Sequence, residues 1–179
     1  MRKLAVIALV FMAANFAVAQ IPTAGNVFFG YSYYNTNVNG SRNNLNGWEG
    51  SIEGKFLPFV GIVADFDGHY GSESFSACNG FDCVLFNTDV THHNYLFGPR
   101  VSISVGKFRP FAELLIGASH VDVRNATSDT SFATAVGGGL DYKLFHLLAW
   151  RFQGDYVHSN QFNTPQHNLR LSTGIVLRF

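Results

Sequence analysis

The sequence is poor in charged residues, and its charges cancel. Charged residues make up 13% of the 179 residues, and 12 Lys and Arg balance 12 Asp and Glu, so the formal net charge is zero. Nucleic-acid-binding proteins carry a basic patch or stripe, so nucleic acid is not an expected partner. Disordered chains combine low hydrophobicity with high net charge, and 47% hydrophobic residues argue against that class. At this length we expect one folded domain after any targeting segment.

The chain also lacks an apolar run long enough for a membrane helix after residue 19, since a spanning helix needs ~20 apolar residues. The first residues are different. Arg2 and Lys3 precede an apolar run from Leu4 to Ala19 that ends in small residues, Ala17-Val18-Ala19. This order is typical of a secretory signal peptide. We therefore expect residues 1–19 to be a cleaved signal peptide and residues 20–179 to be the mature domain; an N-terminal membrane anchor is the alternative.

Cysteine is scarce as well: Cys78 and Cys83 are the only two, and both fall in the polar segment "SACNGFDCVLF". In an exported protein, two cysteines this close predict a disulfide. This disulfide would constrain the tip of a loop rather than the whole fold. A two-cysteine metal site is the alternative, but no further cysteine is present to complete it.

Helical periodicity is missing, whereas alternation with period two recurs along the mature chain. We expect eight strands, and their residue ranges are 26–37, 45–57, 59–71, 91–106, 109–123, 130–143, 147–160 and 166–179. Three connections are tight turns, at 56–59, 106–110 and 143–147, and four are longer and polar, at 38–44, 72–90, 124–129 and 160–165. Short turns at one end and long loops at the other are typical of an outer-membrane β-barrel.

The two faces of each expected strand differ in a way that favours this barrel over a soluble β-sandwich, which would alternate too. One face carries bulky apolar and aromatic residues, and the other mixes Gly and Ser with charges of both signs. Small and charged residues suit the narrow interior of a small barrel, and aromatics at strand ends suit interfacial girdles. We predict an all-β fold, an eight-stranded antiparallel up-and-down transmembrane β-barrel with short periplasmic turns and long extracellular loops. A secreted soluble β-sandwich remains the alternative.

The charges assigned to the inner face nearly cancel. The acids are Glu49, Glu53, Asp65, Asp67, Glu113, Asp141 and Asp155, and the bases are Lys55, Arg100, Lys143, Arg151, Arg170 and Arg178. An eight-stranded barrel has an interior just wide enough for side chains, and unpaired charges there would be costly. We predict an ion-pair network that plugs the lumen. Its central bases would be Arg100, Arg151 and Arg170, and their acidic partners Glu53, Asp65, Glu113 and Asp155. Ordinary solvated strand charges are the alternative.

Several stretches resemble the OmpA-like outer-membrane β-barrel domain family. "GNVFFGYSYY" resembles its first strand, and "YLFGPRVSISVGKFRPFAELLIGASH" and "ATAVGGGLDYKL" resemble its fourth to sixth strands. The terminal "NLRLSTGIVLRF" resembles the C-terminal assembly signal of outer-membrane proteins, which here consists of Leu171, Thr173, Ile175, Leu177 and Phe179. The resemblance implies a barrel in the outer membrane of a Gram-negative-type bacterium, with outer-membrane lipid, periplasmic chaperones and the barrel-assembly machinery as partners. It implies no single shared activity.

Candidate catalytic and metal-binding residues are few. "YVHSNQF" invites comparison with lipid A deacylases, which are eight-stranded barrels whose catalytic His and Ser share a strand face. Here His158 and Ser159 are adjacent and would point to opposite faces, so no catalytic site is predicted. The other histidines near the longer connections are His69, His92, His93, His120 and His167. None has the HxxxH or HExxH spacing, so we predict no metal site and no cofactor.

Together these features predict a non-enzymatic, monomeric barrel in the cell outer membrane that supports envelope integrity or contacts surfaces through its loops. The alternatives are a narrow passive channel, a lipid A-modifying enzyme and a secreted binding module. No motif in the loops names a ligand.

Overall fold

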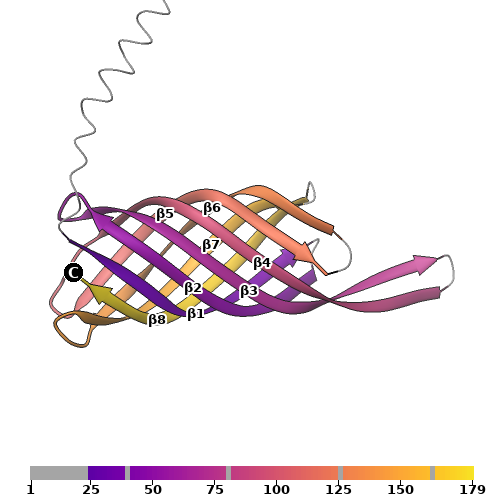
Figure 1. The fold of residues 1–179 in the computed structure, drawn as a ribbon, viewed down its shortest axis with the longest axis horizontal. Helices are drawn as coiled ribbons and strands as arrows, with labels where there is room; N and C mark the ends of the chain where they lie inside the picture. The colour runs from indigo at the N-terminus through magenta and orange to yellow at the C-terminus, as the bar shows by residue number, and fades with distance from the viewer. Residues whose placement is uncertain (1–23, 39–40, 80–81, 125–126, 162–163) are drawn as a thin grey trace, which may run out of the picture.

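The computed structural model describes residues 24–38, 41–79, 82–124, 127–161 and 164–179, and within these the side chains of 38, 41, 73–87 and 127 are not described. The predicted signal peptide therefore lies outside the described residues. Eight strands are present (Figure 1): β1 Ala24–Val38, β2 Ser41–Lys55, β3 Val60–Asn79, β4 Asp82–Ser102, β5 Phe108–Val123, β6 Thr127–Lys143, β7 Leu148–Gln161 and β8 Thr164–Arg178. Among the described residues there is no helix long and apolar enough to span a membrane.

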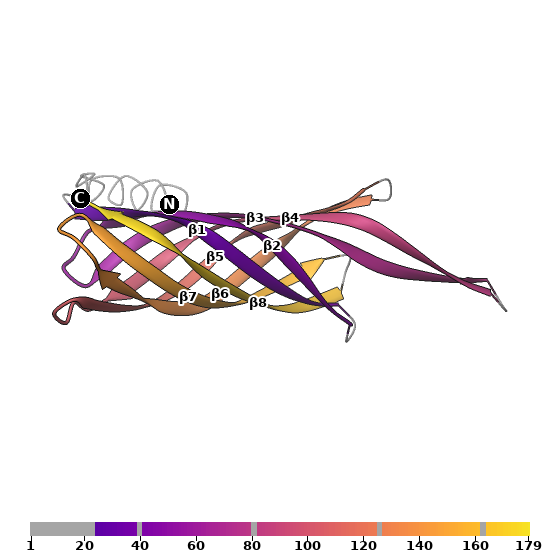
Figure 2. The same ribbon diagram turned by 90° about the horizontal axis from the view of Figure 1, so that it is seen from below.

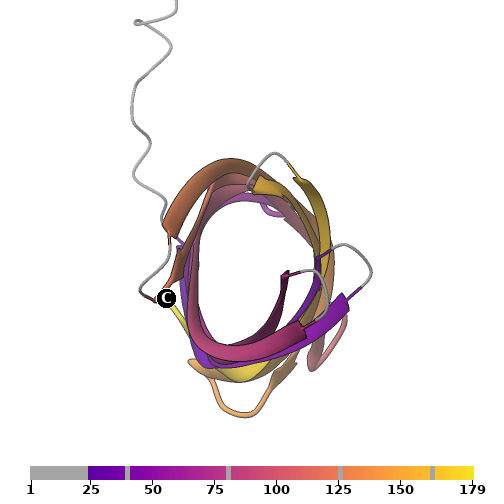
Figure 3. The same ribbon diagram turned by 90° about the vertical axis from the view of Figure 1, so that its right-hand side faces the viewer.

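The strands form one closed barrel in chain order, in which each strand pairs antiparallel with its neighbours and β1 pairs with β8. Viewed along the barrel axis, the strands make a complete ring (Figure 3). Beyond the end of β8, Phe179 completes the seam: Gly25 donates its N–H to the Phe179 carbonyl at 2.9 Å, and Phe179 donates to the Gly25 carbonyl at 3.1 Å. The predicted eight-stranded antiparallel barrel is confirmed.

The alternation of polar and apolar residues in the sequence corresponds to an alternation of buried and exposed side chains along the strands. In β7, Arg151, Gln153 and Asp155 are buried while Trp150 and Phe152 are exposed. The outer face of the barrel is largely apolar. The large hydrophobic side chains exposed on its strands include Phe29, Tyr31, Ile52, Ile62, Tyr95, Phe97, Leu114, Phe132, Val136, Phe152, Tyr156, Leu171, Ile175 and Leu177. A soluble monomer rarely exposes so large an apolar area, so this surface is suited to contact with lipid.

One end of the barrel, here called the turn end, carries the connections at residues 56–59, 103–107 and 144–147. In the second of these, Val105 and Phe108 exchange backbone hydrogen bonds at 2.8 and 3.0 Å around Gly106, whose φ is 61°. A positive φ favours glycine, which has no Cβ to clash with the backbone. The three tight turns therefore lie close to where the sequence predicts them, although the second begins earlier than expected.

The opposite end, here called the hairpin end, differs from the prediction of long polar loops. Strand pairing continues through most of those segments, as far as Val38↔Ser41, Asn79↔Asp82, Val123↔Thr127 and Gln161↔Thr164. The β3–β4 hairpin extends well beyond the other strands (Figures 1 and 2). The sequence loses its alternation in these segments, but antiparallel backbone hydrogen bonding does not depend on that alternation and continues there. The prediction read the loss of alternation as loop, and that was wrong.

Candidate functional site

The barrel interior is the densest concentration of charge in the described structure. The seven acids predicted to face inward are each at most 4% exposed, and Arg100, Arg151 and Arg170 are among the largest fully buried side chains. The sequence places them inward because each lies an even number of residues from other inward positions of its strand. Barrel closure then decides which of them meet.

Arg170, on β8, lies at the centre of the first group of charges. Its Nη1 is 2.6 Å from Asp65 Oδ1 and also contacts Asp67 Oδ2. Its Nη2 is 2.9 Å from Asp155 Oδ2, and its Nε is 3.5 Å from Glu49 Oε2. One guanidinium thus contacts four carboxylates from three other strands. Ser172, two residues further along β8, donates a hydrogen bond to the Glu49 carboxylate.

A second group surrounds Arg100, on β4. Its Nη2 is 2.6 Å from Glu113 Oε2, and its Nη1 is 3.4 Å from Glu53 Oε2. The other oxygen of Glu53 is 3.4 Å from Nη2 of Arg109, which also donates to Ser102 Oγ at 2.9 Å. The prediction omitted Arg109, which is 7% exposed. Its position two residues before Phe111 on β5 is the signal that would have placed it inward.

The third group lies nearer the turn end and is centred on Asp141. Arg151 donates from Nε to Asp141 Oδ1 at 2.7 Å, and Arg178 donates from Nη2 to Asp141 Oδ2 at 3.2 Å. The Phe111 ring lies between two guanidinium groups, with its centroid 4.5 Å from Arg100 Cζ and 4.6 Å from Arg151 Cζ. This cation–π contact joins the second group of charges to the third.

Gln153, on β7, connects the first group to the second. Its Nε2 lies 2.9 Å from an oxygen of each of Glu49, Glu113 and Asp155. Since an amide nitrogen has two hydrogens, at most two of these bonds form at once. The three groups form one network along the barrel, and side chains from all eight strands line it.

One predicted base departs from its expected position. Lys143 is exposed, because it is the last residue of β6 and lies at the rim of the turn end rather than inside. Lys55, the last residue of β2, is part-buried, and its ammonium donates to Pro58 O at 3.3 Å and to the buried Ser102 Oγ at 3.1 Å. A residue at the end of a strand can keep the inward parity and still lie outside the enclosed part of the barrel.

Two of the histidines that the sequence places near the longer connections lie inside the barrel, on the hairpin side of Arg170. His69 on β3 and His92 on β4 are cross-strand partners and are 0% and 1% exposed. The ring of Tyr34 is 4.7 Å from each imidazole ring, measured between centroids. The inward parity of Asp65 and Asp67 on β3 extends to His69, and this signal could have placed it.

The segment around His158 and Ser159 has the arrangement that the sequence predicts. Ser159 is buried, while His158 is part-exposed on the outer face and faces His167 across β7 and β8, with 3.3 Å between their Nδ1 atoms. The Tyr156 hydroxyl is 2.5 Å from His167 Nδ1. Ser159 and His158 therefore cannot act together as a nucleophile and its base.

Two further predictions concern residues at the ends of the barrel. Cys78 and Cys83 are paired in register on β3 and β4, but their side chains lie outside the described part, so the disulfide stays a prediction. The residues of the predicted assembly signal lie on the outer face of β8 and at its end, and Phe179 is 64% exposed.

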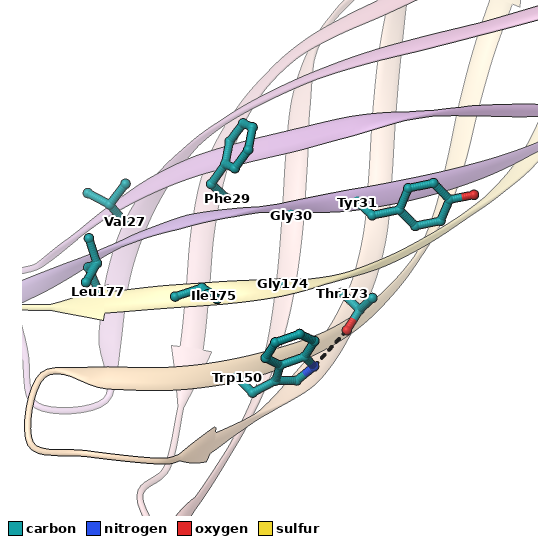
Figure 4. Close-up of a pocket in the computed structure, with 9 residues that line it drawn as sticks. All are labelled: Val27, Phe29, Gly30, Tyr31, Trp150, Thr173, Gly174, Ile175 and Leu177. Carbon is teal, nitrogen blue, oxygen red and sulfur yellow. Dashed lines mark hydrogen bonds between the residues drawn. The ribbon is translucent and has the colours of Figure 1, made fainter.

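On the outer face, a shallow apolar hollow of about 400 Å³ crosses the seam between β1 and β8 (Figure 4). Val27 and Phe29 lie on one side of it, and Ile175 and Leu177 on the other. The Trp150 indole donates a hydrogen bond to Thr173 Oγ1 at 2.9 Å. The hollow is part of the apolar exterior and carries no charged group among its lining residues.

Comparison with solved structures finds the same fold in small outer-membrane proteins. Ail, the attachment invasion locus protein of Yersinia pestis, matches 87% of this chain and 98% of its own with 18% identity and a TM-score of 0.57. Neisserial surface protein A matches 87% of this chain and 99% of its own with 12% identity and a TM-score of 0.70. The sequence matches no protein-family model and no curated protein. At these identities the likeness shows the fold, that of small eight-stranded outer-membrane barrels, in agreement with the OmpA-like resemblance.

Proposed function

We propose that the protein is a non-enzymatic, integral outer-membrane barrel whose lumen is closed by its own ion-pair network and which presents its hairpin end to the cell exterior. The observation that carries this proposal is the continuous chain of buried contacts from Arg170 through Gln153 and Arg100 to Arg151. These side chains occupy the space through which a solute would pass.

The apolar exterior supports a location in a membrane. Thirty ångströms of hydrocarbon require ~9–11 tilted residues per strand, and the shortest strand, β7, has 14. The expected signal peptide and C-terminal assembly signal support export and insertion by periplasmic chaperones and the barrel-assembly machinery. In such barrels the short turns face the periplasm, so the hairpin end would face outward.

The β3–β4 hairpin supports a role in surface contacts. Its two strands have 20 and 21 residues in all, and their paired ends extend beyond the barrel wall, further than the neighbouring strands in both side views (Figures 1 and 2). A projection of this kind places contact residues at a distance from the membrane. We propose that the hairpin contacts surfaces or ligands outside the cell.

Conductance in planar lipid bilayers tests the closed lumen. The refolded barrel is expected to show no steady conductance, and a variant with Arg100→Gly and Arg151→Gly, which removes two large interior side chains, is expected to conduct. A steady large conductance of the unmodified barrel would contradict the proposal and favour the narrow passive channel. If neither protein conducts although the variant is shown to be inserted, these two arginines do not block the lumen.

Cell fractionation and a lipid A mass spectrum test the remaining parts. The protein is expected in the outer-membrane fraction and to migrate differently on gels before and after boiling, as folded barrels do. Lipid A is expected to keep its mass when the protein is expressed. A mass change would support a lipid A-modifying enzyme, and recovery in a soluble fraction would support a secreted binding module.

A further inference from the structure

The lumen network does not account for the buried histidine pair, which lies next to Asp67, a member of that network. Asp67, His69 and His92 are each at most 1% exposed, and one ligand atom from each lies within 4.8 Å of the others. They come from adjacent strands, Asp67 and His69 from β3 and His92 from β4. Two imidazoles and one carboxylate are a donor set that divalent transition metals prefer.

The charge balance around Arg170 favours a cation at this position. Arg170 is the only Lys or Arg in the described residues that forms an ion pair with Glu49, Asp65, Asp67 or Asp155. Four buried carboxylates therefore share one guanidinium. Excess buried charge of one sign is costly in a low-dielectric interior, and a divalent ion next to Asp67 would remove most of that excess.

The two oxygens of Asp67 face different partners. Oδ2 contacts Arg170 Nη1, whereas Oδ1 lies 3.2 Å from His69 Nδ1 and accepts hydrogen bonds from Asn94 N at 3.2 Å and Asn94 Nδ2 at 2.9 Å. His69 Nδ1 is buried and makes no hydrogen bond. Two zinc ligands at ~2.0–2.2 Å in tetrahedral geometry are separated by about 3.3 Å. The Asp67–His69 edge already has that length, so only His92 must approach.

The other ring nitrogens are held by hydrogen bonds, as the outer partners of metal-bound histidines are. His69 Nε2 lies 2.9 Å from Ser32 Oγ. His92 Nε2 lies 3.1 Å from Ser119 Oγ, which would accept its N–H with a metal on Nδ1, while Gln161 Nε2, also at 3.1 Å, donates to Ser119 Oγ at 2.7 Å. These contacts fix the imidazole planes and leave Nδ1 of His69 for a ligand. Nδ1 of His92 lies 3.4 Å from Asn94 Nδ2, so the Asn94 amide must turn when an ion binds. Asn94 Oδ1 is buried without a hydrogen-bond partner, and that turn would offer it as the fourth ligand.

We propose that Asp67, His69 and His92 bind one Zn²⁺ ion inside the barrel and so join β3 to β4 at the base of the projecting hairpin. Zinc is the expected ion because it accepts imidazole nitrogen and carboxylate oxygen in a four-coordinate site. The site is separate from the proposed surface role, and neither depends on the other.

Zinc binding is tested on the refolded mature barrel after removal of metal with a chelator. The surface pair is removed first with His158→Gln and His167→Gln, because their Nδ1 atoms are 3.3 Å apart and could bind zinc themselves. In this background we expect one zinc ion per barrel and a higher unfolding temperature with zinc than without it, since a ligand that binds only the folded state stabilises it.

Further substitutions in that background locate the ion. His69→Gln or His92→Gln is expected to weaken zinc binding more than about 100-fold, and Ser32→Ala, which removes the partner of His69 Nε2, about 10-fold. His146→Gln, in the exposed turn at 144–147, is the control and should bind zinc as before. Asp67 is left unchanged because it also holds Arg170. Unchanged zinc affinity in folded His69→Gln or His92→Gln would overturn the proposal.

X-ray absorption of the zinc-loaded barrel keeps the proposal testable if those variants do not fold. In the His158→Gln, His167→Gln background, the spectrum should show two imidazole ligands and oxygen ligands. A spectrum with one imidazole or none, or an absence of bound zinc, would overturn the proposal.

Discussion

Gly30 and Gly174 lie directly opposite each other on β1 and β8, at the seam where the barrel closes. A Cβ atom on Gly174 would lie 2.4 Å from the Gly30 Cα atom and 2.4 Å from the Phe29 carbonyl oxygen. Backbone atoms cannot move aside as a flexible side chain can. The first and last strands therefore approach so closely that this position requires glycine.

We predict that Gly174→Ala destabilises the barrel or prevents its closure. Forcing an atom into a packed site costs about 1–3 kcal/mol, occasionally more. The fraction of heat-modifiable protein after refolding and the urea midpoint measure the effect. Gly50→Ala is the matched control, because its Cβ would meet atoms no closer than 3.7 Å. Equal midpoints for the two variants would contradict the close approach at the seam.

We predict that Arg170→Met strongly destabilises the barrel. The substitution leaves Glu49, Asp65 and Asp155 without an ion-pair partner among the described residues. Removing one member of a buried ion pair costs about 3–5 kcal/mol. Adding Asp65→Asn should restore part of that loss, because one uncompensated charge is then removed. Unfolding in urea, monitored by tryptophan fluorescence, measures both variants.

The exposed pair Arg124–Asp89 provides the control for Arg170. Its side chains are 70% and 62% exposed at a separation of 3.0 Å. Exposed ion pairs contribute about 0–1 kcal/mol, so Arg124→Met should change the unfolding midpoint little. If Arg170→Met were as mild as Arg124→Met, the interior network would contribute no more than a surface pair.

We predict that Phe179→Ala reduces insertion in cells but hardly affects the folded barrel. The substitution keeps the two backbone hydrogen bonds between Phe179 and Gly25 and removes only the aromatic side chain that resembles an assembly signal. Outer-membrane yield in cells and the urea midpoint after refolding separate the two effects. Phe145→Ala, at an exposed turn residue, is the control. Equal cellular yields for both variants would argue against the assembly role.

We predict that Cys78 and Cys83 are joined in the exported protein. Directly opposed residues of antiparallel strands have Cα atoms about 4.5–5.5 Å apart, within the range that a disulfide bridges, and the two cysteines are such partners in register. Alkylation with a maleimide before and after reduction measures free thiols. Two thiols reactive before reduction would disprove the bond. Cys78→Ser should leave one reactive thiol and an unchanged barrel.

Much of the barrel could be predicted from local patterns. A strand that is apolar on one face and polar on the other shows its orientation in the sequence, as Trp150 and Arg151 do on β7. The same reasoning failed where the wall ends. Lys143 keeps the inward parity but lies at the rim, and the segment 72–90 loses its alternation but remains paired. Alternation along a strand shows to which face a side chain points, but it does not show whether the barrel encloses that position.

The sequence by itself determined the strand number, the two faces and most of the charges that face inward, because each follows from alternation within a single strand. Only the tertiary structure decided the partners. Arg170 meets Asp65, 105 residues away, because barrel closure places β8 across the lumen from β3. The register between β3 and β4 brings His92 beside His69 and Asp67. Distances between strands depend on register and curvature, and neither is encoded in the pattern of any one strand.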